Sequence, residues 1–417
     1  MKWVSQLITS YNLMTCNISP EDTAKGAIVA SISKQSPNYW FSWTRDSALT
    51  MNVLSVLQVF TNANPELNLK LQTQEQLDVF FNNYASFSYK NQRTETMSAG
   101  IDDSNLGEPR FNVDGSASNV PWGRVQNDGP AMRSLTLIRY LRSSGRSTDW
   151  YSSNFDSLIK MDCEYVAKKV NSPCIDLWEE NYGMHFYNAV AYDKSLEACG
   201  KIATSSGDIG AADYYLKQRQ ISQQNIKKHM NGDYIIQTYN PIGGSLKKAS
   251  NMDIAAVLAI IHTDVNPDDV VYASHPKALA TVATLQNAFI KVYPINNNPD
   301  SVYEAKKHNL GFAFGRYPED TYNGVDNSDV ANPWFLATAA IAEYYYTLIE
   351  EYTELKEIEV NQANKIFFTD VLGRQMSNSL IKSDNPIFGD ILNQLFNLAD
   401  KQLHRMMVML INVVSWG

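Results

Sequence analysis

The sequence predicts an all-α protein of about a dozen helices. Apolar residues recur at three- and four-residue spacing through long segments, and clusters of Gly, Pro, Asn and Asp separate these segments. Ile254, Val257, Leu258 and Ile261 illustrate the apolar stripe of one such helix. Strand-like alternation is scarce. Composition is even along the chain, with no linker rich in Pro, Gly and Ser, so residues 1–417 are predicted to form one domain.

The candidate helices follow one another along the whole chain. They are expected near residues 2–16, 46–60, 73–86, 129–143, 154–170, 184–200, 207–230, 250–262, 274–290, 332–354, 361–382 and 386–411. Helices of similar length joined by long loops suit six helical hairpins closed into a double ring. Alternate connections in such an array emerge at the same end, and long ordered loops usually carry function.

Charge and hydropathy exclude two classes of partner. The net charge is -9, and Lys and Arg are scattered rather than gathered in a stripe, so nucleic acid is not expected to bind. The longest apolar run in the middle of the chain, residues 254–261, is far shorter than the roughly 18 to 20 residues that span a membrane. Neither a membrane contact nor a partner chain is expected, and we expect a monomer.

The first 15 residues carry Ser, Gln, Thr and Asn where a signal peptide would be continuously apolar. The residues themselves therefore leave the compartment open. The four cysteines form no CxxC pair and no cluster with His, so neither a zinc site nor any other metal site is expected. One or two disulfide bridges are compatible with their number.

Residues 175–186, IDLWEENYGMHF, hold the main candidate for catalysis. Apolar neighbours and a nearby like charge favour the protonated form of a carboxylic acid, which can then protonate a leaving group. Glu179, between Trp178 and Glu180, fits this description. The alternative is that the WEE triplet begins a surface helix, where acids favour the positive end of the helix dipole. His185 is interpreted as a packing residue.

Three further stretches carry the residue types of a carbohydrate site. They are YWFSWTRDS at 39–47, LGEPRFNVDG with PWGRVQNDGPAMR at 106–133, and GRYPEDTYNG with NPWFLAT at 315–338. Adjacent Arg45 and Asp46 pair a charged donor with a charged acceptor, which can grip vicinal sugar hydroxyls. The alternative interpretation of TRDS is a helix start, with Asp46 near the N-terminus and Arg45 on the surface. Arg124 and Asp128 are interpreted as an internal ion pair that fixes their loop.

These four blocks resemble, in the same order, the catalytic domain of fungal glucoamylases (glucan 1,4-alpha-glucosidases), the inverting glucosidases of glycoside hydrolase family 15. The match covers most of residues 1–400. The resemblance implies an (α/α)6 barrel and an exo-acting enzyme that releases glucose from the non-reducing ends of α-1,4 and, more slowly, α-1,6 glucans such as starch or glycogen. It implies no metal or organic cofactor, and a secreted or vacuolar location. No starch-binding module is expected.

The resemblance also assigns roles to individual residues. Glu179 matches the general acid, Glu180 contacts the leaving sugar, and Arg45 with Asp46 binds the terminal glucose. Trp122 is the ring expected to stack on or close over that glucose. The remaining substrate-binding candidates are Tyr39, Trp43, Trp178, Arg316, Asp320, Tyr322 and Trp334, and all four blocks are expected to line one pocket.

The C-terminal region departs from the family pattern. The family carries its general base on a glutamate in an acidic loop near the C-terminus, but this chain has no Asp or Glu after Asp400. Residues 401–417, of which 406–417 read MMVMLINVVSWG and are apolar on all sides, are an atypical ending that suggests an incomplete barrel, and no substitute base is nominated. General base catalysis is typically worth about 10²–10⁴-fold. The alternative functions are therefore a catalytically impaired glucan-binding protein or truncated gene product, and, more weakly, another glycosidase of the same barrel class.

Overall fold

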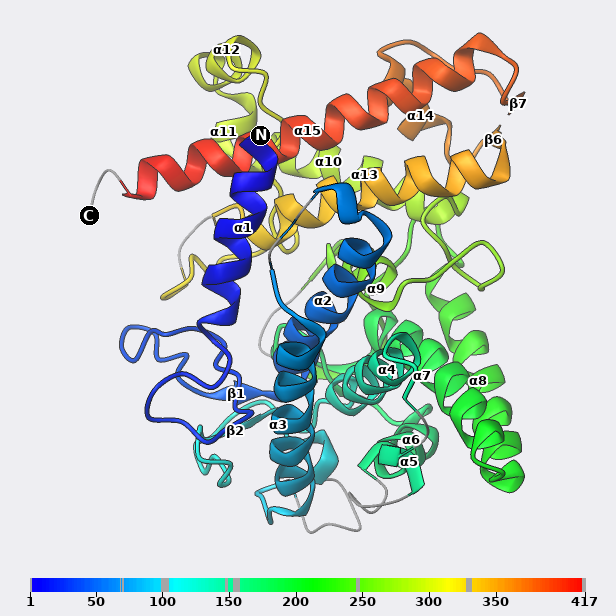
Figure 1. The fold of residues 1–417 in the computed structure, drawn as a ribbon. Coiled ribbons are helices and arrows are strands. Elements are labelled where there is room, and N and C mark those ends of the chain that lie inside the picture. Colours follow the sequence, from blue (N-terminus) through cyan, green and yellow to red (C-terminus); the bar gives the residue numbers. More distant parts are fainter. Residues whose placement is uncertain are drawn as a thin grey trace. The chain divides into compact units, whose positions relative to one another are not determined.

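Helices dominate the described chain, as predicted. Figure 1 shows them coloured along the sequence from blue to red. The computed structural model describes all residues except 1, 68, 70, 99–104, 147–148, 153–157, 245–247, 328–331 and 415–417. The chain divides into two compact units, a first unit of residues 1–184 and 191–222 and a second unit of residues 185–190 and 223–417. None of the helices in the described ranges is both long and apolar enough to span a membrane.

The first unit contains most of the elements that carry predicted site residues. Its elements are α1 (Lys2–Thr15), β1 (Ser42–Trp43), α2 (Thr44–Ala63), α3 (Gln74–Arg93), β2 (Arg110–Phe111), α4 (Asp128–Ser143), α5 (Asp149–Ser152), α6 (Leu158–Lys169), β3 (Cys174–Ile175) and β4 (Asn181–His185), with short 3-10 turns at Pro65–Leu67 and Asn105–Gly107. Helices α7 (Phe186–Ser205) and α8 (Ile209–His229) each have residues in both units, and so does β4, whose last residue His185 belongs to the second unit.

The core of the first unit lies between α2, α4 and α6. Helix α4 packs against both α2 and α6. Its Tyr140 ring stacks on Phe81 of α3, with 3.8 Å between ring centroids, and also on Trp150 at 5.6 Å. A disulfide joins Cys163 of α6 to Cys199 of α7. Buried aromatic and aliphatic side chains thus provide a rigid support for the loops that precede α2 and α4.

Two short antiparallel strand pairs hold the loops of interest in the first unit. Strand β1 pairs with β2, with Trp43 opposite Arg110. Strands β3 and β4 form a hairpin with Ile175 opposite Tyr182. Residues 176–180 are therefore the loop of a hairpin, and the interpretation of WEE as a helix start is wrong.

The second unit consists of β5 (Thr238–Gly244), α9 (Ala255–Thr263), α10 (Pro276–Val292), α11 (Pro294–Asn297), α12 (Pro299–Lys307), α13 (Phe335–Leu355), β6 (Glu357–Val360), α14 (Lys365–Leu372), β7 (Ser379–Lys382) and α15 (Pro386–Val414). Helix α13 packs against α9 and lies along the long helix α15 (Figure 1). The helix predicted at 361–382 is too long, because α14 ends at Leu372. Gly373, whose φ is +63°, caps the helix, and β7 then pairs with β6.

Helix α15 holds an irregular segment of the second unit. Arg405, on its last turns, donates from Nε to the carbonyl oxygen of Gly311 at 2.8 Å, and the Gly311 N–H donates to the carbonyl oxygen of Lys401 at 2.8 Å. Gln402 packs so closely that a Cβ on Gly311 would lie 2.5 Å from its Oε1. The helix thereby fixes the start of the segment that leads to Arg316.

Candidate active site

The hairpin loop at 176–180 is shaped by one buried carboxylate. Asp176 is fully buried, and its Oδ1 accepts hydrogen bonds from the backbone N–H groups of Glu180 at 2.8 Å and Asn181 at 3.1 Å. The Glu179 N–H donates back to the carbonyl oxygen of Asp176 at 2.9 Å, and Glu179 has a φ of +66°. A left-handed conformation is unfavourable for a residue with a Cβ, and such outliers cluster at functional sites. The loop therefore holds Glu179 in one direction.

The Glu179 side chain is half-buried and accepts two hydrogen bonds on the same oxygen. Trp43 Nε1 donates to Glu179 Oε1 at 2.8 Å, and Gln126 Nε2 donates to the same oxygen at 2.9 Å. Among the described residues none is hydrogen-bonded to Oε2. The two N–H donors occupy Oε1 and leave Oε2 as the oxygen of Glu179 that can carry a proton.

Gln126 connects the acid to the arginine of TRDS. Its Oε1 accepts a hydrogen bond from Arg45 Nη1 at 3.2 Å, while its Nε2 also donates to the carbonyl oxygen of Gly123 at 3.1 Å. A Cβ on Gly123 would lie 3.2 Å from the carbonyl oxygen of Glu179, so glycine permits this close approach of two loops. One amide thus fixes Glu179 and Arg45 relative to each other.

Arg45 and Asp46 lie in the first turn of α2, as the helix-start interpretation predicted, but Arg45 is not on the surface. Its side chain is 11% exposed, and Nη1 donates to Asp128 Oδ2 at 2.7 Å. The Asp46 side chain as a whole is 45% exposed, but its Oδ2 is buried and lies 3.6 Å from Arg45 Nε. Burial raises the pKa of Asp46; the charge of Arg45 opposes this rise, and the carboxylates of Glu179 and Asp128 add to it. The charges of Arg45, Asp128 and Glu179 therefore all act on Asp46.

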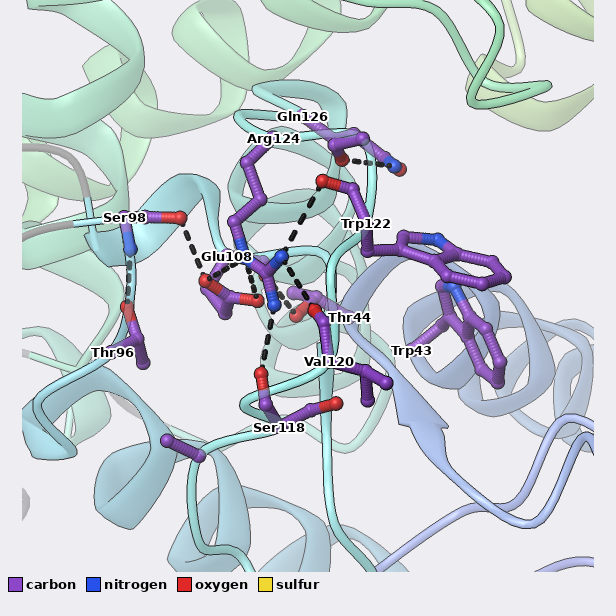
Figure 2. Close-up of polar contacts among 12 residues, drawn as sticks. Trp43, Thr44, Thr96, Ser98, Glu108, Ser118, Val120, Trp122, Arg124 and Gln126 are labelled. Carbon is purple, nitrogen blue, oxygen red and sulfur yellow. Dashed lines mark hydrogen bonds and ion pairs between the residues drawn. The ribbon is translucent and has the colours of Figure 1, made fainter.

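Arg124 anchors the loop that carries Trp122, but not through Asp128. Its Nε lies 2.8 Å from Oε1 and 2.9 Å from Oε2 of the buried Glu108, and its Nη2 donates to the carbonyl oxygen of Ser118 at 2.8 Å (Figure 2). The predicted ion pair between Arg124 and Asp128 is wrong, because Asp128 pairs with Arg45 instead. The correct partners are distant in sequence, which spacing alone does not indicate.

Aromatic rings surround the acid in the first unit. Trp43 is buried, and its ring contacts those of Tyr39 at 6.2 Å, Phe41 at 5.9 Å and Trp122 at 6.2 Å. Figure 2 shows the Trp43 and Trp122 rings side by side. Trp122 is 40% exposed and so presents an apolar surface to solvent at the site. Trp43, predicted only as a substrate-binding residue, also binds Glu179 through its indole N–H.

The second unit holds its own cluster around Arg316. Arg316 is buried and binds Asp320 with two hydrogen bonds, Nε to Oδ2 at 2.8 Å and Nη2 to Oδ1 at 2.6 Å. Its guanidinium carbon lies 5.3 Å from the centre of the Tyr322 ring and 5.1 Å from that of Trp334. A Cβ on Gly315 would lie 1.8 Å from the hydroxyl of Tyr293, so glycine is required before Arg316. The four predicted residues of this block lie together.

The structure thus places the predicted residues in two groups, each within one unit. The first unit holds Tyr39, Trp43, Arg45, Asp46, Trp122, Trp178, Glu179 and Glu180, and the second holds Arg316, Asp320, Tyr322 and Trp334. Sequence reasoning missed Gln126 and Arg110. Gln126 lies in PWGRVQNDG and Arg110 in LGEPRFNVDG. Nothing in these two sequence blocks indicates which residues the two side chains contact. Within the described ranges no three His, Cys, Asp or Glu side chains gather as metal ligands would.

Comparison with known proteins decides the family. The sequence model described as glycosyl hydrolases family 15 matches residues 8–407. The chain belongs to this family. The resemblance that the four blocks indicated is therefore confirmed.

Relatives within family 15 are similar over most of this chain. Glucoamylase 1 of Rhizopus oryzae is 34% identical over 359 residues, which are 85% of this chain and 56% of that protein. Glucoamylase GLA1 of Saccharomycopsis fibuligera is 33% identical over 415 residues, 92% of this chain and 76% of that protein. The chain thus spans little more than half the length of the Rhizopus relative.

Solved family 15 structures show the same fold. A glucoamylase structure from Saccharomycopsis fibuligera matches with a TM-score of 0.81 and 28% identity, covering 97% of this chain and 86% of that one. The Hormoconis resinae glucoamylase structure matches with a TM-score of 0.81 and 26% identity, covering 97% of this chain and 66% of that one. These structures are (α/α)6 barrels, and the predicted fold class is confirmed.

Proposed function

We propose that this chain is an exo-acting glucosidase that releases glucose from the non-reducing ends of α-1,4 and α-1,6 glucans, such as starch or glycogen, with inversion. Membership of family 15 supports the reaction class. The observation that carries the proposal is the arrangement of Glu179, whose Oε1 accepts hydrogen bonds from Trp43 and Gln126. An inverting glycosidase needs one protonated carboxylic acid at the leaving oxygen, and this geometry leaves Oε2 of Glu179 as the oxygen that can carry the proton.

The acid step follows from the two oxygens of Glu179. Because Oε1 is occupied by two N–H donors, the proton resides on Oε2, from which it passes to the glycosidic oxygen as the bond to the sugar breaks. The same two donors then stabilise the carboxylate that remains, since hydrogen bonds to a charged acceptor are stronger than those to a neutral one. Trp43 and Gln126 thus stabilise the product of proton transfer more than the reactant, which is the requirement for catalysis.

The neighbouring charges supply the means of holding a sugar. Arg45 is fixed by Asp128 and Gln126, and the exposed part of Asp46 lies beside it. A rigid donor next to a rigid acceptor discriminates between sugars with and without the matching hydroxyls, because an unmatched polar group at the site is left without a partner. The other substrate-binding residues proposed are Tyr39, Trp122, Trp178, Glu180, Arg316, Asp320, Tyr322 and Trp334.

Inversion further requires a carboxylate that activates water on the opposite face of the sugar. No residue of this chain is proposed for this base. A second candidate function is a protein that binds glucans but cleaves them poorly.

One assay tests the proposal. Purified protein is incubated with maltotriose, glucose release is followed, and the anomer first released is identified by NMR. We expect β-glucose from the wild type and a loss of at least about 10²-fold in rate for Glu179→Gln, whose amide oxygen can still accept both hydrogen bonds. Glu304→Gln, on the exposed side of α12, is the matched control.

Three results would count against the proposal. Glucose release that Glu179→Gln leaves unchanged would remove the acid assignment. Release of α-glucose would exclude inversion. Calorimetric binding of maltotriose without any release of glucose would favour the glucan-binding alternative instead.

A further inference from the structure

Arg110 is a buried cation enclosed by aromatic rings. Its residue is only 3% exposed, although it lies on β2 at the edge of the site. The guanidinium carbon lies 3.8 Å from the centre of the Trp122 ring, 4.3 Å from that of Phe41 and 5.1 Å from that of Trp43. These contacts hold the plane of the guanidinium beside the residues that surround Glu179.

Among the residues that the structure describes, no carboxylate forms a close ion pair with the guanidinium of Arg110, in contrast to the neighbouring arginines. Arg45, Arg124 and Arg133 each form a close ion pair with a buried carboxylate of the first unit. In contrast, Arg110 Nε is enclosed without an acceptor. No described residue accepts a hydrogen bond from its terminal nitrogens either. The small exposed remainder of the side chain is therefore where an acceptor from outside can reach it.

An arrangement of this kind is costly for a folded protein. Burial of a charge without a hydrogen-bonded partner is unfavourable, and cation–π contacts return only about 0.5–2 kcal/mol each. Burial lowers the pKa of Arg110, and the nearby charge of Glu179 opposes that effect. A buried donor group without a partner calls for an explanation, and a bound ligand that supplies the acceptor is one.

We propose that Arg110 is a further saccharide-binding residue, whose terminal guanidinium N–H groups donate to hydroxyl oxygens of the sugar that lies against Trp122. The inference rests on the proposed function, because it takes a neutral glucan as the ligand. The rings provide the orientation and the guanidinium provides the donors. Such a charge-assisted hydrogen bond is worth about 1.5–3 kcal/mol, which corresponds to roughly 10- to 150-fold in affinity.

The test measures binding without turnover. The probe is a maltotriose analogue with sulfur in place of the glycosidic oxygens, and its Kd for the full chain is measured by calorimetry. Arg110→Met removes every donor and retains an apolar stem, and we expect it to weaken binding at least about tenfold. Its Tm should stay unchanged or rise, because an unpaired buried charge has been removed. A merely structural Arg110 would instead give a lower Tm and an unchanged Kd.

Two further variants sharpen the test. Arg110→Lys retains the charge but loses the planar group of donors, so its Kd should lie between those of the wild type and Arg110→Met. Arg93→Met removes an arginine that also packs on a ring, that of Tyr89 at 3.5 Å, and should leave the Kd unchanged.

Each outcome bears on one of the two proposals. A wild-type Kd in Arg110→Met, or in Arg110→Lys should the Met variant not fold, overturns the role of Arg110. If the wild type itself neither binds the probe nor releases glucose from maltotriose, the proposed function fails, and the role of Arg110 fails with it.

Discussion

Trp43 and Glu179 lie 136 residues apart in sequence and are joined by a single hydrogen bond of 2.8 Å from the indole Nε1 to Oε1. Trp43 is the last residue of β1, and Glu179 lies in the hairpin loop that follows β3. Because the indole N–H can only donate, it selects Oε1 as the oxygen without a proton. The oxygen on which Glu179 can carry a proton thus depends on a residue that is not itself ionisable.

Loss of the indole N–H should slow the proposed reaction without impairing binding. Trp43→Phe retains an aromatic ring but removes one of the two donors on Glu179, and we expect kcat to fall about tenfold, or ~1.4 kcal/mol, with KM little changed. Steady-state glucose release from maltotriose measures both constants. Trp150→Phe, another buried tryptophan, is the control and should affect only Tm. A normal kcat in Trp43→Phe would show that the indole N–H contributes nothing to the acid.

Gln126 should affect both steps, because it contacts both functional groups. Gln126→Leu removes the second donor from Glu179 and one acceptor from Arg45, so kcat should fall and KM should rise, each by about three- to tenfold. The matched control is Gln92→Leu, since Gln92 is equally buried but donates to Asp162 in the core. Gln92→Leu should lower Tm and leave both constants unchanged; the opposite pattern would argue against the linking role of Gln126.

The disulfide should stabilise the first unit substantially. Cys163 and Cys199 are 36 residues apart, and in the chain-entropy model a loop of this length is worth about 4 kcal/mol. Reduction or Cys163→Ala should therefore shift the urea midpoint of unfolding to lower concentration. Cys174→Ala is the control, because burial raises the pKa of its thiol to about 12 and makes it unreactive. A urea midpoint that does not respond to reductant would contradict the prediction.

His229 should make the second unit acid-sensitive. Burial lowers the pKa of His229 from 6.5 to about 4. Between these values the unfolded chain binds a proton that the folded chain does not, so the free energy of unfolding falls as pH falls from about 6.5 to about 4, by up to ~3 kcal/mol.

The variant that tests this is His229→Asn. Its amide can replace the hydrogen bond from Nδ1 to the carbonyl oxygen of Ile236, but it cannot be charged. Urea unfolding of both proteins at several pH values should give a shallower slope for the variant in this window. Equal slopes would assign the acid sensitivity to other groups.

Much of the fold could be predicted from the sequence, because long amphipathic helices leave a strong periodic signal. The ranges predicted at 2–16 and 129–143 agree with α1 and α4 within a residue. The prediction at 361–382 is wrong because the pairing of β6 with β7 is a contact between separate segments. Helix α12 was missed although Asn298 and Pro299 form a standard helix start, since it has only nine residues and none of them is buried.

The candidate site could be predicted at the level of blocks but not of partners. Glu179, Arg45 and Trp122 could be picked out because each is the distinctive residue of its block, and Gln126 and Trp43 connect them in the structure. The ion-pair partners of Arg124 and Asp128 could not be predicted. Several acidic residues lie near each arginine in sequence, and only the folded backbone determines which of them forms the ion pair. The roles of Gln126 and Arg110 depend on distances of a few ångströms that no spacing rule provides.

The hydrogen bond from Arg405 to Gly311 joins residues 94 positions apart, so α15 also holds the segment at Gly311 in place. A protease that cut the chain between Asp400 and Arg405 would free the carbonyl oxygen of Gly311 and loosen the approach to Arg316. The order of the cluster around Arg316 therefore depends on an intact α15.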